Sequence, residues 1–154
     1  MNDKSEFQNE IETAIAGVGD MPFEVSNKEY VISKVEKIYV EGRPRVWWLS
    51  FKHIDAIDHF DDNSGYASIF ERIEKLNKNT DNPDKEVYLI ADEDEDGNAL
   101  LVYKVFPNKI RIIIDNCRYF EYYIVADDFS WLIAENDHGD IIECKKPDTE
   151  IKPE

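Results

Sequence analysis

Apolar residues recur at helical spacing near the N-terminus. The stretch starts after Ser5, and Ser5 with Gln8 has the spacing of a capping box. The apolar positions that follow the 3.6-residue period are Phe7, Ile11, Ala14, Ile15 and Val18. Because Gly17 and Gly19 interrupt the pattern, the sequence predicts a first amphipathic helix that ends near these glycines.

Two further stretches predict helices. The first runs from Ser26 to Gly42, with Ser26 and Glu29 at capping-box spacing and Gly42 as the expected stop. Its β-branched and aromatic content leaves a strand-rich alternative open. The second runs from Tyr66 to Leu76, and its apolar residues follow the helical period closely.

The segment between these two helices combines aromatic and acidic residues. Residues 45–52 contain Trp47 and Trp48 in an apolar run, for which we expect a short helical turn in or beside the core. For residues 54–64 we expect a loop that carries four aspartates. These are Asp55, Asp58, Asp61 and Asp62.

Short β-favouring runs dominate the C-terminal half. A hairpin is predicted from runs at 87–91 and 99–103, followed by a helix from Pro107 to Phe120. Three more strands are predicted at 121–125, 131–134 and 141–144. The order β-β-α-β-β-β predicts an α+β fold, with N-terminal helices packed on a mostly antiparallel C-terminal sheet and one inserted helix. We expect residues 1–144 to form a single domain and residues 145–154 a flexible tail.

The net charge of the chain limits the kinds of partner that it is expected to bind. The 154 residues include 18 Lys+Arg and 34 Asp+Glu, a formal charge of −16. Such acidity opposes binding to nucleic acid or to an anionic membrane. No apolar run approaches the roughly 20 residues of a membrane span, the first residues lack a signal-peptide pattern, and two cysteines are too few for a disulfide framework. We therefore expect a cytoplasmic protein.

The sharpest local motif is a run of acids in the predicted hairpin loop. Asp92, Glu93, Asp94, Glu95 and Asp96 precede Gly97, and the alternate aspartates match the first half of a calcium-binding EF-hand loop. The twelfth position, which needs a bidentate Glu, is Tyr103. We expect a solvated hairpin turn, and a calcium-responsive domain stays open as an alternative.

Other chemistry-bearing residues are scattered. His138 lies in a turn with Asp137 and Asp140, so a hydrolase that uses His138 and nearby acids is a second alternative, although turn hydrogen bonds explain these residues more simply. Cys117 falls on the apolar stripe of the predicted helix, which favours an inert buried thiol. We expect no catalytic or metal-ligating residues, no cofactor and no enzymatic activity.

Several strand and turn motifs carry a resemblance. The strand Glu121–Val125, the run Phe129–Ile133, the turn Glu135–His138 and the upstream pair Trp47–Trp48 resemble a family of small, functionally uncharacterised bacterial cytosolic proteins. Small acidic α+β proteins of the SUKH type, which act as immunity proteins in bacterial toxin systems, are similar in this broad sense. By that analogy, the resemblance implies an immunity role.

The combined expectation is a non-enzymatic acidic interaction protein, most concretely an immunity protein that neutralises a toxin. Its partner would be a protein with a basic surface, steered by acidic loops. Trp48 is the expected aromatic anchor. The acidic contact residues are Asp55, Asp58, Asp61, Asp62, Asp92, Glu93, Asp94, Glu95 and Asp96. The sequence leaves the oligomeric state open.

Overall fold

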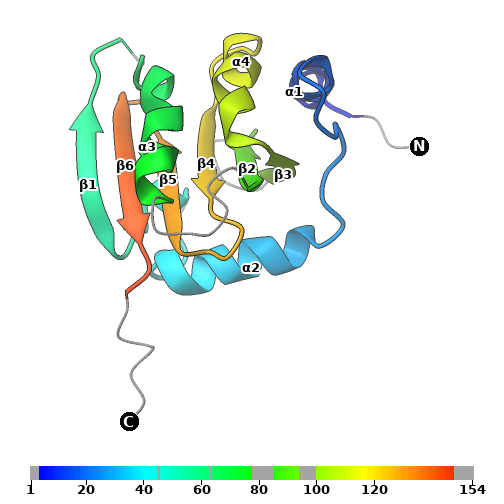
Figure 1. The fold of residues 1–154 in the computed structure, drawn as a ribbon. Helices are drawn as coiled ribbons and strands as arrows, with labels where there is room; N and C mark the ends of the chain where they lie inside the picture. Colours follow the sequence, from blue (N-terminus) through cyan, green and yellow to red (C-terminus); the bar gives the residue numbers. More distant parts are fainter. Residues whose placement is uncertain (1–3, 45, 63, 78–84, 94–99, 148–154) are drawn as a thin grey trace.

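The protein folds into a six-stranded antiparallel sheet with helices on both faces (Figure 1), as a computed structural model shows. The structure describes residues 4–44, 46–62, 64–77, 85–93 and 100–147. The predicted α+β class, with its mostly antiparallel sheet, is confirmed. No helix in these ranges is long and apolar enough to cross a membrane.

The sheet has the strand order β1-β6-β5-β4-β2-β3, and every neighbouring pair is antiparallel. The strands are β1 (Ile54–His59), β2 (Val87–Asp92), β3 (Leu100–Val105), β4 (Glu121–Val125), β5 (Trp131–Glu135) and β6 (Asp140–Lys145). The hairpin of β2 and β3 and the three strands after it are therefore confirmed. β1 and β3 form the two edges of the sheet.

Two apolar clusters lie on opposite faces of the sheet. One face is covered by α1 (Glu6–Gly17), α3 (Ile69–Leu76) and α4 (Ile110–Asp115), and the other by α2 (Lys28–Tyr39). The four inner strands are buried on both faces, which explains why they are almost continuously apolar in sequence. The N-terminal helices thus lie on opposite faces of the sheet, an arrangement that their periodicity alone did not predict.

Local signals located most helices correctly. Ser5 accepts a hydrogen bond from the backbone N–H of Gln8 at 2.9 Å, so the predicted cap of α1 is confirmed. The inserted helix is confirmed as α4, which follows the short 3₁₀ helix η3 (Pro107–Lys109). It ends at Asp115 and not at the predicted Phe120, so Cys117 lies beyond the helix. The predicted turn at Trp47 is the 3₁₀ helix η1 (Trp47–Ser50), and α3 follows the 3₁₀ helix η2 (Gly65–Ser68).

The prediction of a loop over residues 54–64 is wrong, because residues 54–59 form β1. Among the described residues this strand pairs only with β6, from Ile54 opposite Cys144 to His59 opposite Asp140, with a register shift between Ile54 and Ala56. Most of its residues are exposed, so the strand has no buried face and no apolar alternation to reveal it. Its position depends on pairing with a strand more than 80 residues away in sequence.

The bounds of α2 and β6 also differ from the expectation. α2 begins at Lys28 after Asn27, without the predicted cap by Ser26, and it ends at Tyr39 before Gly42. The strand-rich alternative for this stretch is wrong. β6 includes Lys145, so regular structure extends into the segment expected to be a tail, of which residues 148–154 lie outside the described part of the chain.

Candidate functional site

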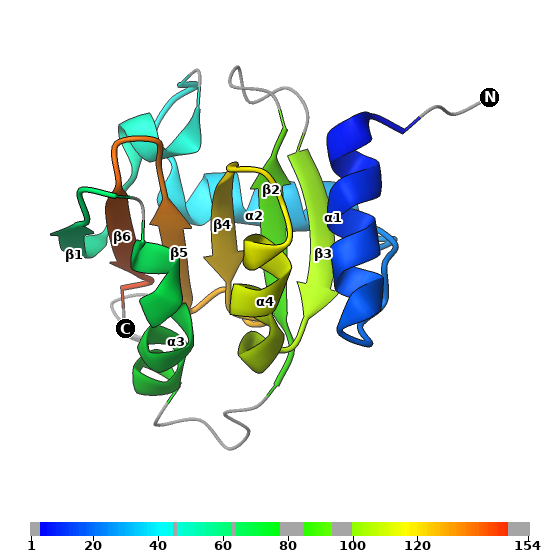
Figure 2. The same cartoon turned by 90° about the horizontal axis from the view of Figure 1, so that it is seen from above.

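Carboxylates gather where β2 and β5 end and β4 and β6 begin. The register places Asp92 opposite Glu121, and Tyr122 opposite Glu135, so these acids lie on adjacent strands at one end of the sheet. Figure 2 shows the β5–β6 turn, the end of β2 and the start of α1 along this same end. We call it the acidic sheet end and define it by Asp92, Glu93, Glu121, Glu135 and Asp137.

A pocket of about 390 Å³ opens at the acidic sheet end, beside the start of α1. Its described lining has five carboxylates, from Glu6, Asp92, Glu93, Glu121 and Asp137. Phe7, Tyr119 and Phe120 supply aromatic surface. The single cationic side chain in this lining is Arg118, which donates to Glu10 at 2.8 Å and lies 3.9 Å from Glu6. We call this cavity the acidic pocket.

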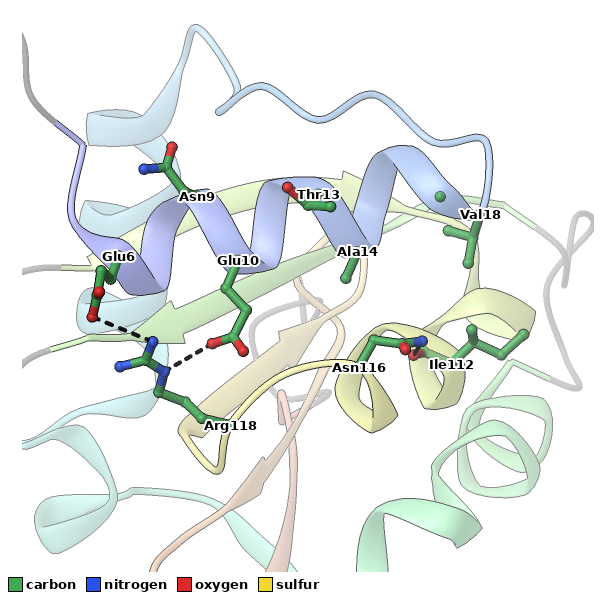
Figure 3. Close-up of a pocket in the computed structure, with 10 residues that line it drawn as sticks. Glu6, Asn9, Glu10, Thr13, Ala14, Val18, Ile112, Asn116 and Arg118 are labelled. Atoms are coloured by element: carbon green, nitrogen blue, oxygen red, sulfur yellow. Dashed lines mark hydrogen bonds and ion pairs between the residues drawn. The ribbon is translucent and has the colours of Figure 1, made fainter.

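A second, more open cavity of about 610 Å³ lies between α1 and α4 (Figure 3). Figure 3 shows Arg118 between Glu6 and Glu10 of α1, with Ile112 of α4 and Asn116, the residue after α4, on the other side of the groove. Arg118 lines both cavities. Because two glutamates neutralise it, it supplies no uncompensated positive charge to either.

Glu121 lines the acidic pocket and accepts hydrogen bonds from two neighbouring segments. Its carboxylate accepts hydrogen bonds from the indole Nε1 of Trp48 at 3.2 Å and from the backbone N–H of Asp137 at 2.7 Å. Burial raises the pKa of Glu121, and these two donors partly oppose the effect. The ring of Trp48 also meets that of His138 edge to face, with 5.5 Å between centroids. The structure thus brings Trp48 and His138 to the acidic sheet end.

Glu135 is the functional candidate that sequence reasoning missed. Its side chain lies on the α3–α4 face of β5 and is 3% exposed, and its Oε2 has no hydrogen-bond partner among the described residues. Burial raises its pKa to about 7, although the nearby hydroxyl of Tyr122 lowers it by a smaller amount. The sequence does hold a signal for this residue. Trp131, Ile133 and Glu135 alternate along β5, so Glu135 shares the inward face of the strand with two core residues.

The aspartates of the β1 region form a separate group. Asp55 lies 3.6 Å from Lys145, and Asp58 accepts from Arg72 at 2.9 Å. Arg72 also donates to Glu143 at 2.7 Å. These two expected contact residues are therefore already paired within the chain.

Two more aspartates follow the end of β1. Asp61 bonds to Nε2 of His59 at 2.9 Å, and Asp62 accepts from the backbone N–H of Ser64 at 3.2 Å. His59 also bonds to Asp140 at 2.9 Å, and this bond with the charges of both aspartates raises the pKa of His59. Of the acidic loop, Asp92 and Glu93 belong to the acidic pocket, whereas Asp94, Glu95 and Asp96 lie outside the described residues.

Cys144 is buried, Cys117 is half-buried, and His138 lies at the surface. Burial raises the pKa of Cys117 to about 11 and that of Cys144 to about 12, so both thiols stay protonated at neutral pH. His138 is mostly exposed, and its Nε2 lies 3.6 Å from Asp137. Within the described ranges, no three His, Cys, Asp or Glu side chains form a group able to hold a metal ion.

Comparison with known proteins places the chain in a family. A family model described as "Family of unknown function (DUF6756)" matches residues 9–152, a span that includes all six strands and most of the acidic pocket. No curated protein and no solved structure matched the chain. Since the match covers nearly the whole sequence, the protein belongs to the DUF6756 family of unknown function.

Proposed function

We propose that this protein is a non-enzymatic, cytoplasmic interaction protein that binds a basic surface of another protein through the acidic pocket. The observation that carries the proposal is the composition of that pocket, with five carboxylates against one arginine that is already paired with Glu10. A cavity of this kind is complementary to a lysine or arginine side chain.

The pocket offers both parts of such a side chain a suitable surface. The aliphatic stem of a lysine or arginine packs against Phe7, Tyr119 and Phe120, while its charged head reaches the carboxylates. Electrostatic attraction is stronger in a partly desolvated pocket than at an open surface. The net charge of −16 adds a long-range field that speeds the approach of a cationic partner.

The most concrete form of this function is immunity against a toxin. A basic enzyme such as a nuclease has a cationic cleft for its substrate, and an acidic protein that covers the cleft excludes that substrate. In this proposal Glu93, Glu121 and Asp137 take the place of substrate phosphates. Trp48 supports the site from within, because its indole holds Glu121 in position.

The test removes charge from the pocket without removing structural hydrogen bonds. We choose the double variant Glu93→Gln with Asp137→Asn, because Asp137 contributes its backbone N–H, not its side chain, to the bond with Glu121. The matched control is Glu71→Gln with Glu74→Gln, which removes two exposed acids of α3. Each protein is co-expressed with the product of the adjacent gene, and association rates are measured at two ionic strengths.

We expect the pocket variant to associate more slowly than wild type, the control to match wild type, and the difference to shrink at high salt because screening acts on the same attraction. An association rate that changes neither in the pocket variant nor with ionic strength would refute electrostatic docking at this site. If the adjacent gene products form no complex, the immunity form of the proposal is rejected.

A further inference from the structure

The cavity between α1 and α4 is continuous with the acidic pocket. We call this cavity of about 610 Å³ the α1–α4 groove. It meets the acidic pocket at Glu6 and Arg118, which line both cavities. Figure 3 shows this junction beside the first turns of α1. A partner segment that occupies the pocket can therefore continue into the groove along the same surface.

The lining of the α1–α4 groove changes from charged to apolar along α1. The end next to the acidic pocket has Glu6, Glu10 and Arg118 (Figure 3). The other end has a smaller and less polar lining, formed by Ala14, Gly17, Val18 and Ile112. Ile112 is 48% exposed, so it offers apolar surface to a bound side chain. The groove thus has a charged end and an apolar end.

Arg118 has hydrogen-bond donors available at the junction of the two cavities. Its Nε donates to Glu10 at 2.8 Å, whereas its Nη2 lies 3.9 Å from Glu6, which is too far for a hydrogen bond. The side chain is 53% exposed, and a guanidinium carries five N–H donors. Backbone carbonyls of a chain that crosses Arg118 are suitable acceptors. A helix uses its carbonyls internally, so such a chain is extended.

Charge complementarity indicates the kind of chain that occupies this surface. The described linings of the two cavities hold six carboxylates and a single cationic side chain, Arg118. The carboxylates are those of Glu6, Glu10, Asp92, Glu93, Glu121 and Asp137. A second copy of this chain, with its formal charge of −16, is repelled by such a surface, whereas a segment with lysine or arginine is attracted.

The geometry of α1 sets the spacing between the two ends of the groove. Glu10 and Gly17 are separated by about 10 Å along the helix axis, since a helix rises about 1.5 Å per residue. An extended chain covers this distance in about three or four residues, at about 3.3 Å each. Side chains of an extended chain point to the same side at even spacing, so a spacing of about four directs both toward the protein.

We propose that the α1–α4 groove and the acidic pocket together bind one extended segment of the basic partner protein. A lysine or arginine of the segment enters the acidic pocket, and a large apolar residue about four positions away enters the apolar end of the groove. Arg118 donates to the backbone between them. This inference rests on the proposed function, because it assumes a basic partner at the acidic pocket, and it adds the sequence pattern that is recognised.

The first test is a titration of the full chain with three synthetic peptides, followed by the backbone amide signals in heteronuclear NMR. One peptide carries an arginine and a leucine at the proposed spacing in a glycine–serine background. The second lacks the leucine, and the third lacks the arginine. We expect the first peptide to shift the amides of Asp137, Thr13 and Gly17, and the second to shift only that of Asp137. The leucine should tighten binding about fivefold, because it buries apolar surface in the groove.

The second test fills the apolar end of the groove with a side chain of the protein itself. A Cβ added at Gly17 meets no described atom within 4 Å, so Gly17→Gln is compatible with the fold. The matched control is Ala16→Gln, at an exposed neighbouring position of α1 outside the lining of the groove. We expect Gly17→Gln to abolish the gain in affinity from leucine and to leave binding of the second peptide unchanged. Ala16→Gln should change neither.

The outcomes separate this inference from the proposed function. If arginine binds the pocket but leucine adds no affinity and shifts no groove amide, the inference is overturned and the proposed function stands. The inference also fails if Gly17→Gln and Ala16→Gln have equal effects, or if the third peptide binds as tightly as the first. Groove amides that shift on dilution of the protein alone would identify a second copy as the occupant. If none of the peptides shifts a pocket amide, both proposals are rejected.

Discussion

We predict that Glu135 makes the stability of this protein depend on pH near neutrality. The side chain is buried on β5, and burial raises its pKa from 4.5 to about 7. A carboxyl whose pKa is higher in the folded state than in the unfolded state favours folding when it is protonated. This contribution is complete below the unfolded pKa and is lost as pH rises through about 7.

The perturbation is Glu135→Gln, which keeps the shape of the side chain and removes its titration. A shift from 4.5 to about 7 corresponds to about 3 kcal/mol in full, and about 2 kcal/mol of this falls between about pH 5.5 and pH 8.5. As pH rises through this range, we therefore expect the free energy of unfolding of wild type to fall by about 2 kcal/mol relative to that of the variant. The tyrosines that sense the charge of Glu135 titrate well above it.

The assay is urea unfolding followed by tryptophan fluorescence at several pH values. The matched control is Glu12→Gln, at a second buried glutamate. Burial raises the pKa of Glu12. The hydrogen bonds from Lys4, Tyr103 and Gln8 and the charge of Lys4 lower it by more than burial raises it, so the net pKa is below 4.5. Its contribution is present above pH 4.5, and we expect Glu12→Gln to be destabilising by the same amount throughout the range. A difference between Glu135→Gln and wild type that does not change with pH would refute the reasoning.

Three further predictions concern local features. Calcium should bind the acidic loop 92–97 no more tightly than about millimolar, since the bidentate glutamate is missing, and micromolar binding in calorimetry would contradict this. Gly65→Ala should destabilise the fold by about 1–3 kcal/mol in urea unfolding, because the new Cβ would lie 2.6 Å from Cγ1 of Ile141. Trp131→Phe removes a buried 2.9 Å hydrogen bond from the indole to Asn77 and should lower the thermal midpoint, at a cost of about 1–3 kcal/mol. An unchanged midpoint would show that this bond is energetically neutral.

Local sequence patterns determined most helices and strands of this protein. The Ser5 cap and the apolar stripe after it located α1, and Pro107 with the spacing of Ile110 and Ile113 located α4. Such signals act within a few turns of chain, because caps and helical faces depend on neighbours three or four residues apart. The acidic composition, and with it the expected class of partner, was equally visible in the sequence.

Only the tertiary structure shows which residues come together in the candidate site. Trp48 meets Glu121 across 73 residues of sequence, and Asp92 faces Glu121 through strand register. Glu135 has a raised pKa because the sheet and helices bury it, and its alternation with Trp131 and Ile133 indicates the face of the strand but not the depth of burial. β1 exists only because β6 is available to pair with it. Strand register, burial and long-range pairing depend on which distant segments of the chain come together. A local sequence pattern depends only on neighbouring residues, so it cannot predict these properties.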